Sequence, residues 1–194
     1  IAPPQMQLVC SALYEELEPG ETTITRALYE REGRAAGILR GHLERVLSRD
    51  LARDQRAAAR RLLESLISSE QQRVIRSQAE LVEELGKLGV TPQTLDTILT
   101  QLVDSRLLRA EETEAGLAYE LAHDYLLSEI RLDPNVQARK AAQELLEQEV
   151  RAYRRYKTLL TEERLNVIEP YRAELRLTPE AEQLLAESRA MVER

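Results

Sequence analysis

The chain has 194 residues, a formal net charge of −7 and an isoelectric point of about 5.1, so general attraction to nucleic acids or anionic membranes is not expected. Apolar residues make up 43% of the sequence, which excludes a disordered chain, although the lack of Phe and Trp leaves the core to aliphatic side chains. The single cysteine, Cys10, excludes an internal disulfide and suits a reducing compartment, so we expect a cytoplasmic protein.

The start of the chain indicates a piece of a longer protein, because the first residue is Ile1 rather than a methionine. The first helix is expected to begin at the prolines at 3–4 and to end before the Pro-Gly pair at 19–20. Cys10 falls on the apolar stripe of this helix, so we predict that it is a small buried hydrophobe. No apolar run in the sequence is long enough to span a bilayer.

Helical periodicity resumes over residues 27–47, and a further helix is expected over residues 54–67. Three glycines in the first of these helices recur at every fourth position: Gly33, Gly37 and Gly41. Glycine is costly inside a helix, so this spacing predicts a face where another helix approaches closely. We expect residues 1–70 to form one helical domain.

Residues 71–131 combine short extended runs with two more helices. Ser77 predicts a helix start, because Glu80 stands three residues later as its partner in a capping box. Thr91-Pro92 predicts the start of the next helix, with proline at the first helical position.

Two strands are expected next, over residues 107–109 and 117–121, and residues 110–116 between them form a hairpin wing. Another short extended run, at residues 73–76, precedes the two helices. Helix, turn, helix, strand, wing and strand is the order of a winged helix, so we predict a winged-helix domain over residues 71–131.

The last third of the chain, residues 132–194, is predicted to be a helical linker or relay region. Asp133 precedes a long helix, and Thr178-Pro179 begins the last one. Thr161 begins a third helix but lacks a capping-box partner, because the third residue after it is an arginine. The expected fold class is mainly α: a helical bundle, a winged helix-turn-helix with a small β-hairpin wing, and C-terminal helices.

The sequence contains no constellation typical of an enzyme. The glycine-lysine phosphate loop, the dinucleotide-binding glycine pattern and the zinc-protease motif are all missing from it. Two histidines and one cysteine are too few for a typical structural zinc site. We therefore expect neither catalysis nor a cofactor or metal held by this chain alone.

A winged helix raises the possibility of DNA binding, but the charges oppose it. The helix from Pro92 to Arg106 carries two aspartates, and its only basic residue stands at the far end. The wing carries three acids and no base: Glu111, Glu112 and Glu114. Base-reading helices need polar or basic side chains at the groove, and phosphate contacts need positive charge, so we expect no nucleic-acid partner.

The two histidines differ in their surroundings. His42 lies within a predicted helix and is expected to be a surface or helix-packing residue. His123 stands where the second strand gives way to a helix, and the free backbone N–H groups of a helix start attract anions. There the imidazole either caps the turn or donates to a phosphate, and local chemistry leaves both interpretations open.

Several segments together resemble bacterial STAND-class signalling NTPases, which are NACHT/NB-ARC-like. Residues 4–16 (PQMQLVCSALYEE) resemble the segment that follows the ATPase core, and the glycine-striped helix from Tyr29 to Val46 resembles the next element. Residues 119–127 (YELAHDYLL) are similar to the histidine motif at the end of the winged helix. Three later segments resemble the region that follows it: 159–165 (LLTEERL), 177–180 (LTPE) and 184–189 (LLAESR).

This resemblance implies a lid that folds against ADP held by an upstream ATPase domain. His123 would contact the β-phosphate of ADP, and Asp124 would cap or orient the junction. The full-length protein would be an ATPase that uses ADP/ATP with Mg, coupled to a downstream sensor domain and able to form homo-oligomers on activation. Asp124 and Tyr125 depart from the family pattern, which commonly has Glu and a small residue at these positions.

Two other classes of function stay open at this point. A winged-helix transcriptional regulator would bind DNA in a salt-dependent way. A helical interaction scaffold would use the long amphipathic helix over residues 133–156 to hold a partner helix.

Overall fold

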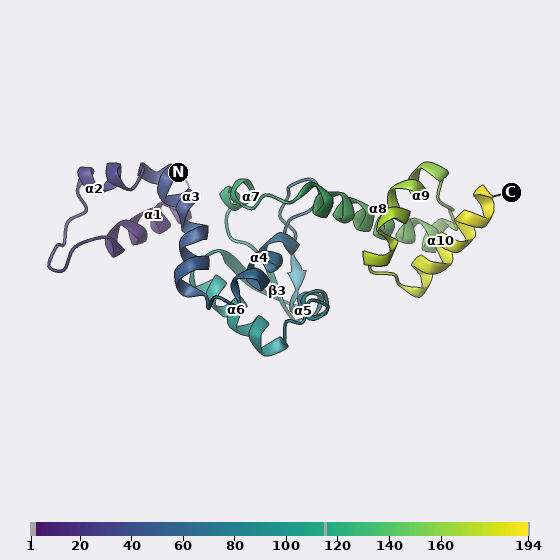
Figure 1. Ribbon diagram of the computed structural model, residues 1–194, viewed down its shortest axis with the longest axis horizontal. Coiled ribbons are helices and arrows are strands. Elements are labelled where there is room, and N and C mark those ends of the chain that lie inside the picture. The colour runs from purple at the N-terminus through teal and green to yellow at the C-terminus, as the bar shows by residue number, and fades with distance from the viewer. Residues whose placement is uncertain (1–2, 115, 194) are drawn as a thin grey trace. The chain divides into compact units, whose positions relative to one another are not determined.

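The computed structural model describes residues 3–114 and 116–193, and these divide into two compact units. Unit 1 comprises the described residues of 1–67 together with 72–131, and unit 2 comprises residues 68–71 and 132–193. Helices dominate both units, and the only sheet in the described part of the chain is small and antiparallel (Figure 1). The predicted mainly α fold is therefore confirmed.

Unit 1 begins with a cluster of short helices. They are α1 (Pro3–Glu15), α2 (Arg26–Arg31), α3 (Arg34–Arg45) and a π-helical turn, η1 (Val46–Asp50). The aliphatic core of this cluster comes from α1, α2 and α3: Val9, Ala12, Leu13, Leu28, Ala35 and Ile38.

The prediction that Cys10 is buried is wrong. Its thiol is exposed, because the buried face of α1 is centred on Val9, Ala12 and Leu13. Successive residues of a helix are rotated by about 100°, so Cys10 points well away from that face. Met6, four residues earlier, is exposed on the same side as Cys10.

The glycine stripe does not mark a close approach of another helix. The expected continuous helix over 27–47 breaks at Gly33, which has φ +80° and separates α2 from α3. A Cβ on Gly37 would stand 3.0 Å from the Glu32 carbonyl oxygen, so this glycine accommodates the backbone of the break itself. A Cβ on Gly41 would meet only the Arg45 side chain within 4 Å. The spacing therefore reflects a turn between two helices.

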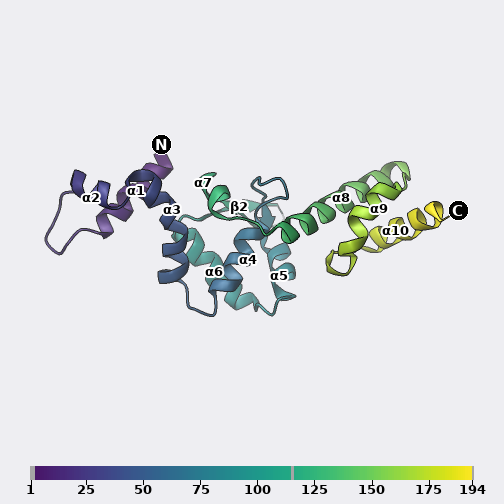
Figure 2. The ribbon, with the colours of Figure 1, turned by 45° about the horizontal axis from the view of Figure 1, so that its top comes forward.

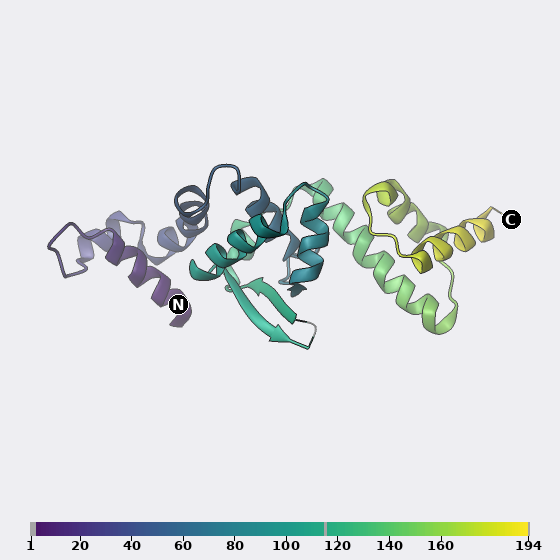
Figure 3. The same cartoon turned by 90° about the horizontal axis from the view of Figure 1, so that it is seen from below.

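The remainder of unit 1 places a three-stranded sheet beside two helices. Its elements are α4 (Arg56–Ser65), β1 (Arg76–Ser77), α5 (Gln78–Gly86), α6 (Pro92–Asp104), β2 (Leu108–Thr113), β3 (Gly116–Leu121) and α7 (Tyr125–Glu129). The strand order is β1-β3-β2, and both pairings are antiparallel. Figure 3 shows the hairpin of β2 and β3 most clearly.

The hairpin is tighter than the predicted wing. The sequence predicts residues 110–113 in the connector, but they belong to β2, whose ladder extends to a pair between Thr113 and Gly116. The acidic composition of this segment concealed an edge strand, where charged side chains face water. One residue of the predicted wing, Ala115, lies outside the described residues.

The predicted N-terminal capping residues begin helices α5 and α6, as expected. The Ser77 side chain accepts a hydrogen bond from the Glu80 N–H, and the Glu80 carboxylate accepts one from the Ser77 N–H, which confirms the capping box. The Thr91 hydroxyl accepts from the Thr94 N–H at the start of α6. These caps satisfy amide groups that the helix leaves without intrahelical partners.

Unit 2 is a helical bundle built on one long helix (Figure 2). Its elements are α8 (Pro134–Tyr156), α9 (Glu162–Ile168), a 3-10 turn, η2 (Glu169–Glu174), and α10 (Pro179–Val192). Aliphatic side chains from α8, α9 and α10, together with Tyr153, form the core. Thr161 makes no side-chain cap bond, whereas the Thr178 hydroxyl accepts from the Ala181 N–H, so the two N-termini differ in their capping.

Candidate functional site

His123 lies at the junction between β3 and α7, as the sequence predicts. The helix that follows has only five residues. The Leu126 N–H donates to the His123 carbonyl over 3.2 Å, and the Leu127 N–H donates to the Asp124 carbonyl over 3.1 Å. These two amides are therefore used within the turn itself.

Asp124 pairs with an arginine from another segment and does not cap α7. Its Oδ1 lies 2.9 Å from Nε of Arg73, and its side chain makes no cap hydrogen bond to α7. The Arg73 guanidinium also donates to the Leu121 carbonyl over 3.2 Å. Arg73 therefore ties the end of β3 and the start of α7 to the segment before β1, through the Leu121 carbonyl and the Asp124 carboxylate.

The His123 ring lies against Tyr125, with 5.8 Å between the ring centroids and an interplanar angle of 19°. Within the described residues, neither ring nitrogen of His123 has a hydrogen-bond partner, so the imidazole does not cap the turn. The Tyr125 hydroxyl is buried and lacks a partner in the same part of the chain, and burial raises its pKa. The His123 ring thus packs on a half-buried tyrosine, and no hydrogen bond within the described residues occupies its nitrogens.

Burial lowers the pKa of His123, and three nearby basic groups lower it further. These groups are His42, Arg73 and Arg106, and the Asp124 carboxylate opposes them. The imidazole is therefore mainly neutral at pH 7, with one ring N–H to donate and one nitrogen to accept. A phosphate placed beside it would favour protonation and gain a second charge-assisted contact.

His42 packs α3 against the end of α6, which confirms its helix-packing role. Its half-buried Nε2 donates to the Ser105 carbonyl over 2.9 Å. Burial lowers its pKa, as does Arg45 on the same helix, whereas the Ser105 hydrogen bond and the carboxylates of Glu15 and Asp50 act in the opposite direction. The fold thus brings the only two histidines of the sequence within electrostatic range of each other.

We call this cluster the histidine junction: His42, Arg73, Arg106, His123 and Asp124. Sequence reasoning identified His123 and Asp124 and missed the three basic neighbours. Arg106 could have been found from the predicted hairpin, because it stands two residues before β2 and His123 stands two residues after β3. No local signal links His42 or Arg73 to His123, because those contacts depend on how α3 and β1 pack.

The surface of α6 and the hairpin carries mainly acidic or already paired side chains. The Gln78 amide donates to Asp96 over 2.7 Å, and Arg109 on β2 forms an ion pair with Glu111. Glu112 on the same strand is exposed. This arrangement offers little positive charge for a phosphate backbone, which speaks against the DNA-binding alternative.

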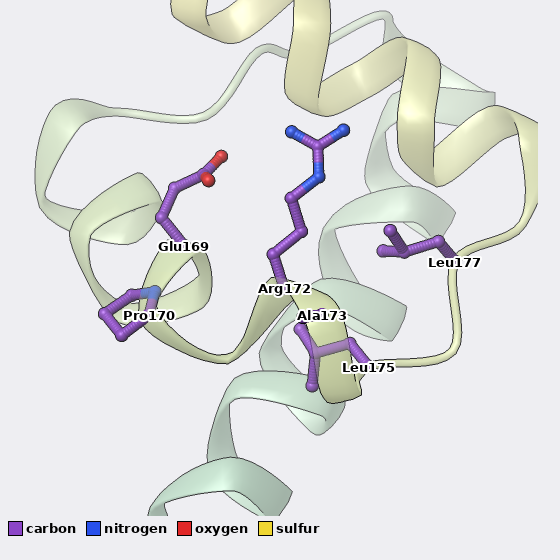
Figure 4. A pocket seen from close by; sticks show the side chains of 6 residues that line it. All are labelled: Glu169, Pro170, Arg172, Ala173, Leu175 and Leu177. Carbon is purple, nitrogen blue, oxygen red and sulfur yellow. The ribbon is translucent and has the colours of Figure 1, made fainter.

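Unit 2 has an open surface depression of about 650 Å³, shown in Figure 4. Six residues line it: Glu169, Pro170, Arg172, Ala173, Leu175 and Leu177. Glu169 and Arg172 project in the same direction from η2 in that view. Arg189 binds the Glu169 carboxylate through its Nε at 2.7 Å, so the depression contains no pair of free acids for acid–base chemistry.

Residues 3–114 and 116–193 lack two further features. No group of three or more His, Cys, Asp or Glu side chains there is arranged to hold a metal ion. No helix in this part of the chain has the length and apolar character needed to cross a membrane.

Comparison with known proteins identifies one family. The model of the family described as Novel STAND NTPase 1 matches residues 3–164, which is most of the chain and includes the whole histidine junction. No curated protein and no solved structure matches the chain.

Proposed function

The chain belongs to the novel STAND NTPase 1 family, and we propose that it is the regulatory lid and relay of a STAND signal-transduction NTPase. In this role it holds the ADP-bound, closed state and couples nucleotide exchange to a sensor or effector domain. The full-length protein is then an ATPase of the NACHT/NB-ARC-like type, and the nucleotide and Mg are held by an ATPase domain upstream of this region.

The histidine junction is the observation that carries this proposal. The chain as a whole has a net charge of −7, yet the groups around His123 are mainly basic. Asp124 is engaged by Arg73, and Arg106 has no ion-pair partner among the described residues. A local excess of positive charge beside a neutral histidine fits a phosphate ligand.

The donors at the junction fit the phosphates of ADP, although they cannot hold a nucleotide alone. His123 would donate a ring N–H to a phosphate oxygen, and Arg73 would keep the junction in place through Asp124. The phosphates of a bound nucleotide would supply negative charge opposite these basic groups. The ATPase domain would provide most of the binding energy for that nucleotide. Loss of a phosphate contact on nucleotide exchange would then release the lid.

The connectivity of unit 1 supports the lid interpretation. Helix α4, strand β1, helices α5 and α6 and the β2–β3 hairpin follow one another in the order of a winged helix, with β1 added at the edge of β3. We interpret this domain as a winged helix that serves a protein contact, because its acidic α6 and hairpin are unsuited to DNA. Unit 2 would connect it to the sensor domain.

The test uses the full-length protein with its ATPase domain. Replacement of His123 with Ala is expected to speed ADP release by about tenfold to a hundredfold, because a hydrogen bond to a charged group contributes about 1.5–3 kcal/mol. Arg109→Gln serves as control, since Arg109 is an exposed residue of the hairpin that pairs with Glu111. Unchanged ADP retention in the His123 variant would overturn the proposal.

A further inference from the structure

The end of α6 has an unusual backbone conformation at an arginine. The Arg106 N–H donates to the Val103 carbonyl and the Leu107 N–H donates to the Leu102 carbonyl, each over 2.9 Å. This is the Schellman pattern, in which the residue at Arg106 is left-handed and is usually glycine. Arg106 has φ +59°, a conformation that is unfavourable for a residue with a side chain. Arg34, Gln71 and Lys157 adopt the same conformation elsewhere in the chain, so the backbone alone assigns no role to Arg106, and its role has to follow from its neighbours.

The hairpin brings this arginine to the same end of the sheet as His123. The Ala122 N–H donates to the Leu107 carbonyl over 2.9 Å, which continues the ladder of β2 and β3 beyond its last strand pair. Arg106 directly precedes Leu107 and His123 directly follows Ala122, so the two residues flank this bonded pair and lie within electrostatic range of each other. The two side chains therefore come from adjacent positions at one end of the hairpin.

Arg106 carries the positive charge of the junction that no carboxylate within the described residues neutralises. Its side chain is exposed and forms no ion pair within the described residues, whereas Arg73 is bound to Asp124. A guanidinium offers up to five N–H donors in a planar fork that matches phosphate oxygens. An exposed, unpaired fork and a nearby histidine offer two separate donor groups, which suits a diphosphate because each phosphate can be bound by its own side chain.

His42 holds the turn that presents Arg106. Its Nε2 donates to the Ser105 carbonyl, which belongs to the residue directly before Arg106. Helix α3 thereby fixes the last turn of α6 from the outside. Without this bond, the left-handed turn would be free to relax and move the guanidinium away from His123.

We propose that Arg106 is a second phosphate-binding residue beside His123 and that His42 is its positioning residue, acting through the Ser105 carbonyl. The ligand class is the diphosphate group of a nucleoside diphosphate, so the inference deepens the proposed function and rests on it. The division of roles is specific: Arg106 contacts the ligand, and His42 does not.

The experiment titrates the 194-residue chain with inorganic pyrophosphate at millimolar concentrations and follows the His123 ring protons by NMR. Arg106→Gln is expected to weaken binding by about tenfold, because a charge-assisted contact of about 1.5 kcal/mol is lost. The pyrophosphate affinity of Arg106→Lys should fall between those of the unaltered chain and Arg106→Gln, since lysine keeps the charge without the planar fork. Arg109→Gln, in the same hairpin, should leave binding unchanged.

The His42 variants separate positioning from folding. His42→Ala should weaken pyrophosphate binding in the same direction as Arg106→Gln, whereas His42→Gln should restore it, because an amide N–H can also reach the Ser105 carbonyl. Urea unfolding of each variant shows whether a loss of binding follows a loss of structure. Equal pyrophosphate affinity in the Ala and Gln variants would overturn the role of His42.

The outcomes distinguish this inference from the proposed function. If Arg106→Gln binds pyrophosphate as well as the unaltered chain, or if that chain shows no response at all, the role of Arg106 is overturned. The lid function is decided separately, by ADP release from the full-length His123→Ala protein. A junction that binds pyrophosphate through Arg106 while ADP release is unchanged would be an anion site without a lid function.

Discussion

The histidine junction of unit 1 and the helical bundle of unit 2 use charge in different ways. In unit 2 the charged side chains that bridge its elements are matched in pairs: Glu149 with Arg164, Arg154 with Glu180, and Glu169 with Arg189. Around His123 at the junction, one carboxylate is set against two arginines and a second histidine. Paired opposite charges hold helices together, whereas a local excess of positive charge favours binding of an anionic ligand. The comparison predicts that unit 2 can be damaged without affecting anion binding, and the reverse.

The largest effect is expected from a cavity in unit 2. Leu184 on α10 is 0% exposed, so Leu184→Ala should lower the free energy of unfolding by about 2–5 kcal/mol. Urea unfolding followed by circular dichroism measures this loss. The response of His123 to pyrophosphate should persist. Val167→Ala, at an exposed position on α9, is the matched control and should change stability little. Loss of the His123 response in folded Leu184→Ala would break the comparison.

A smaller loss is expected when one partner of a matched pair is removed. Arg164→Met leaves the Glu149 carboxylate buried without its cation. We expect a loss of about 1–3 kcal/mol, below the value for a fully buried pair, because the Arg164 side chain is 48% exposed. The double variant Glu149→Met/Arg164→Met should recover most of the stability in urea unfolding. A double variant as unstable as the single one would show that the pair itself stabilises the bundle.

The helix caps allow a comparison of two matched N-termini. Ser77→Ala removes both the hydroxyl acceptor and the reciprocal capping box of α5, at a cost of about 1 kcal/mol. Thr161→Ala should cost only a few tenths of that, because the Thr161 side chain makes no cap bond. Urea midpoints of the two variants measure the difference. Equal losses would mean that the capping bond of Ser77 adds nothing to stability.

Features that depend on neighbouring residues could be predicted from the sequence. The Ser77 capping box and the weaker start at Thr161 need only a few adjacent side chains, and both were predicted. Cys10 was misplaced because the buried face of α1 depends on which helices pack against it. The glycine stripe was misinterpreted because Gly33 adopts a left-handed conformation that spacing alone does not reveal.

The candidate site likewise contains residues that local sequence can identify and residues that only long-range packing reveals. His123 was identified from its local position between a strand and a helix, whereas the His42–Ser105 hydrogen bond joins residues 63 positions apart. Arg106 is an intermediate case, because a correctly predicted hairpin would bring it to the same end of the sheet as His123. The sequence places Arg106 at the end of a helix, and no residue adjacent to it in the sequence links it to His123. The pairing of β2 and β3 brings Arg106 and His123, which flank the two strands, to one end of the sheet.

The smallest effect is a dependence of stability on pH that should belong to unit 1. Burial is the main cause that lowers the pKa of both His42 and His123 below the ordinary value of 6.5. The unfolded chain therefore binds protons first, so stability should fall as pH drops below about 6.5 and should level off above it. Urea midpoints at about pH 7.5 and about pH 5.5 bracket this window, which lies above the ordinary range of carboxylates. His42→Gln/His123→Gln should flatten the dependence, because neither amide titrates. If the double variant retained the full slope, other groups would control the acid sensitivity, and the histidines would lack the protonation energetics that the junction implies.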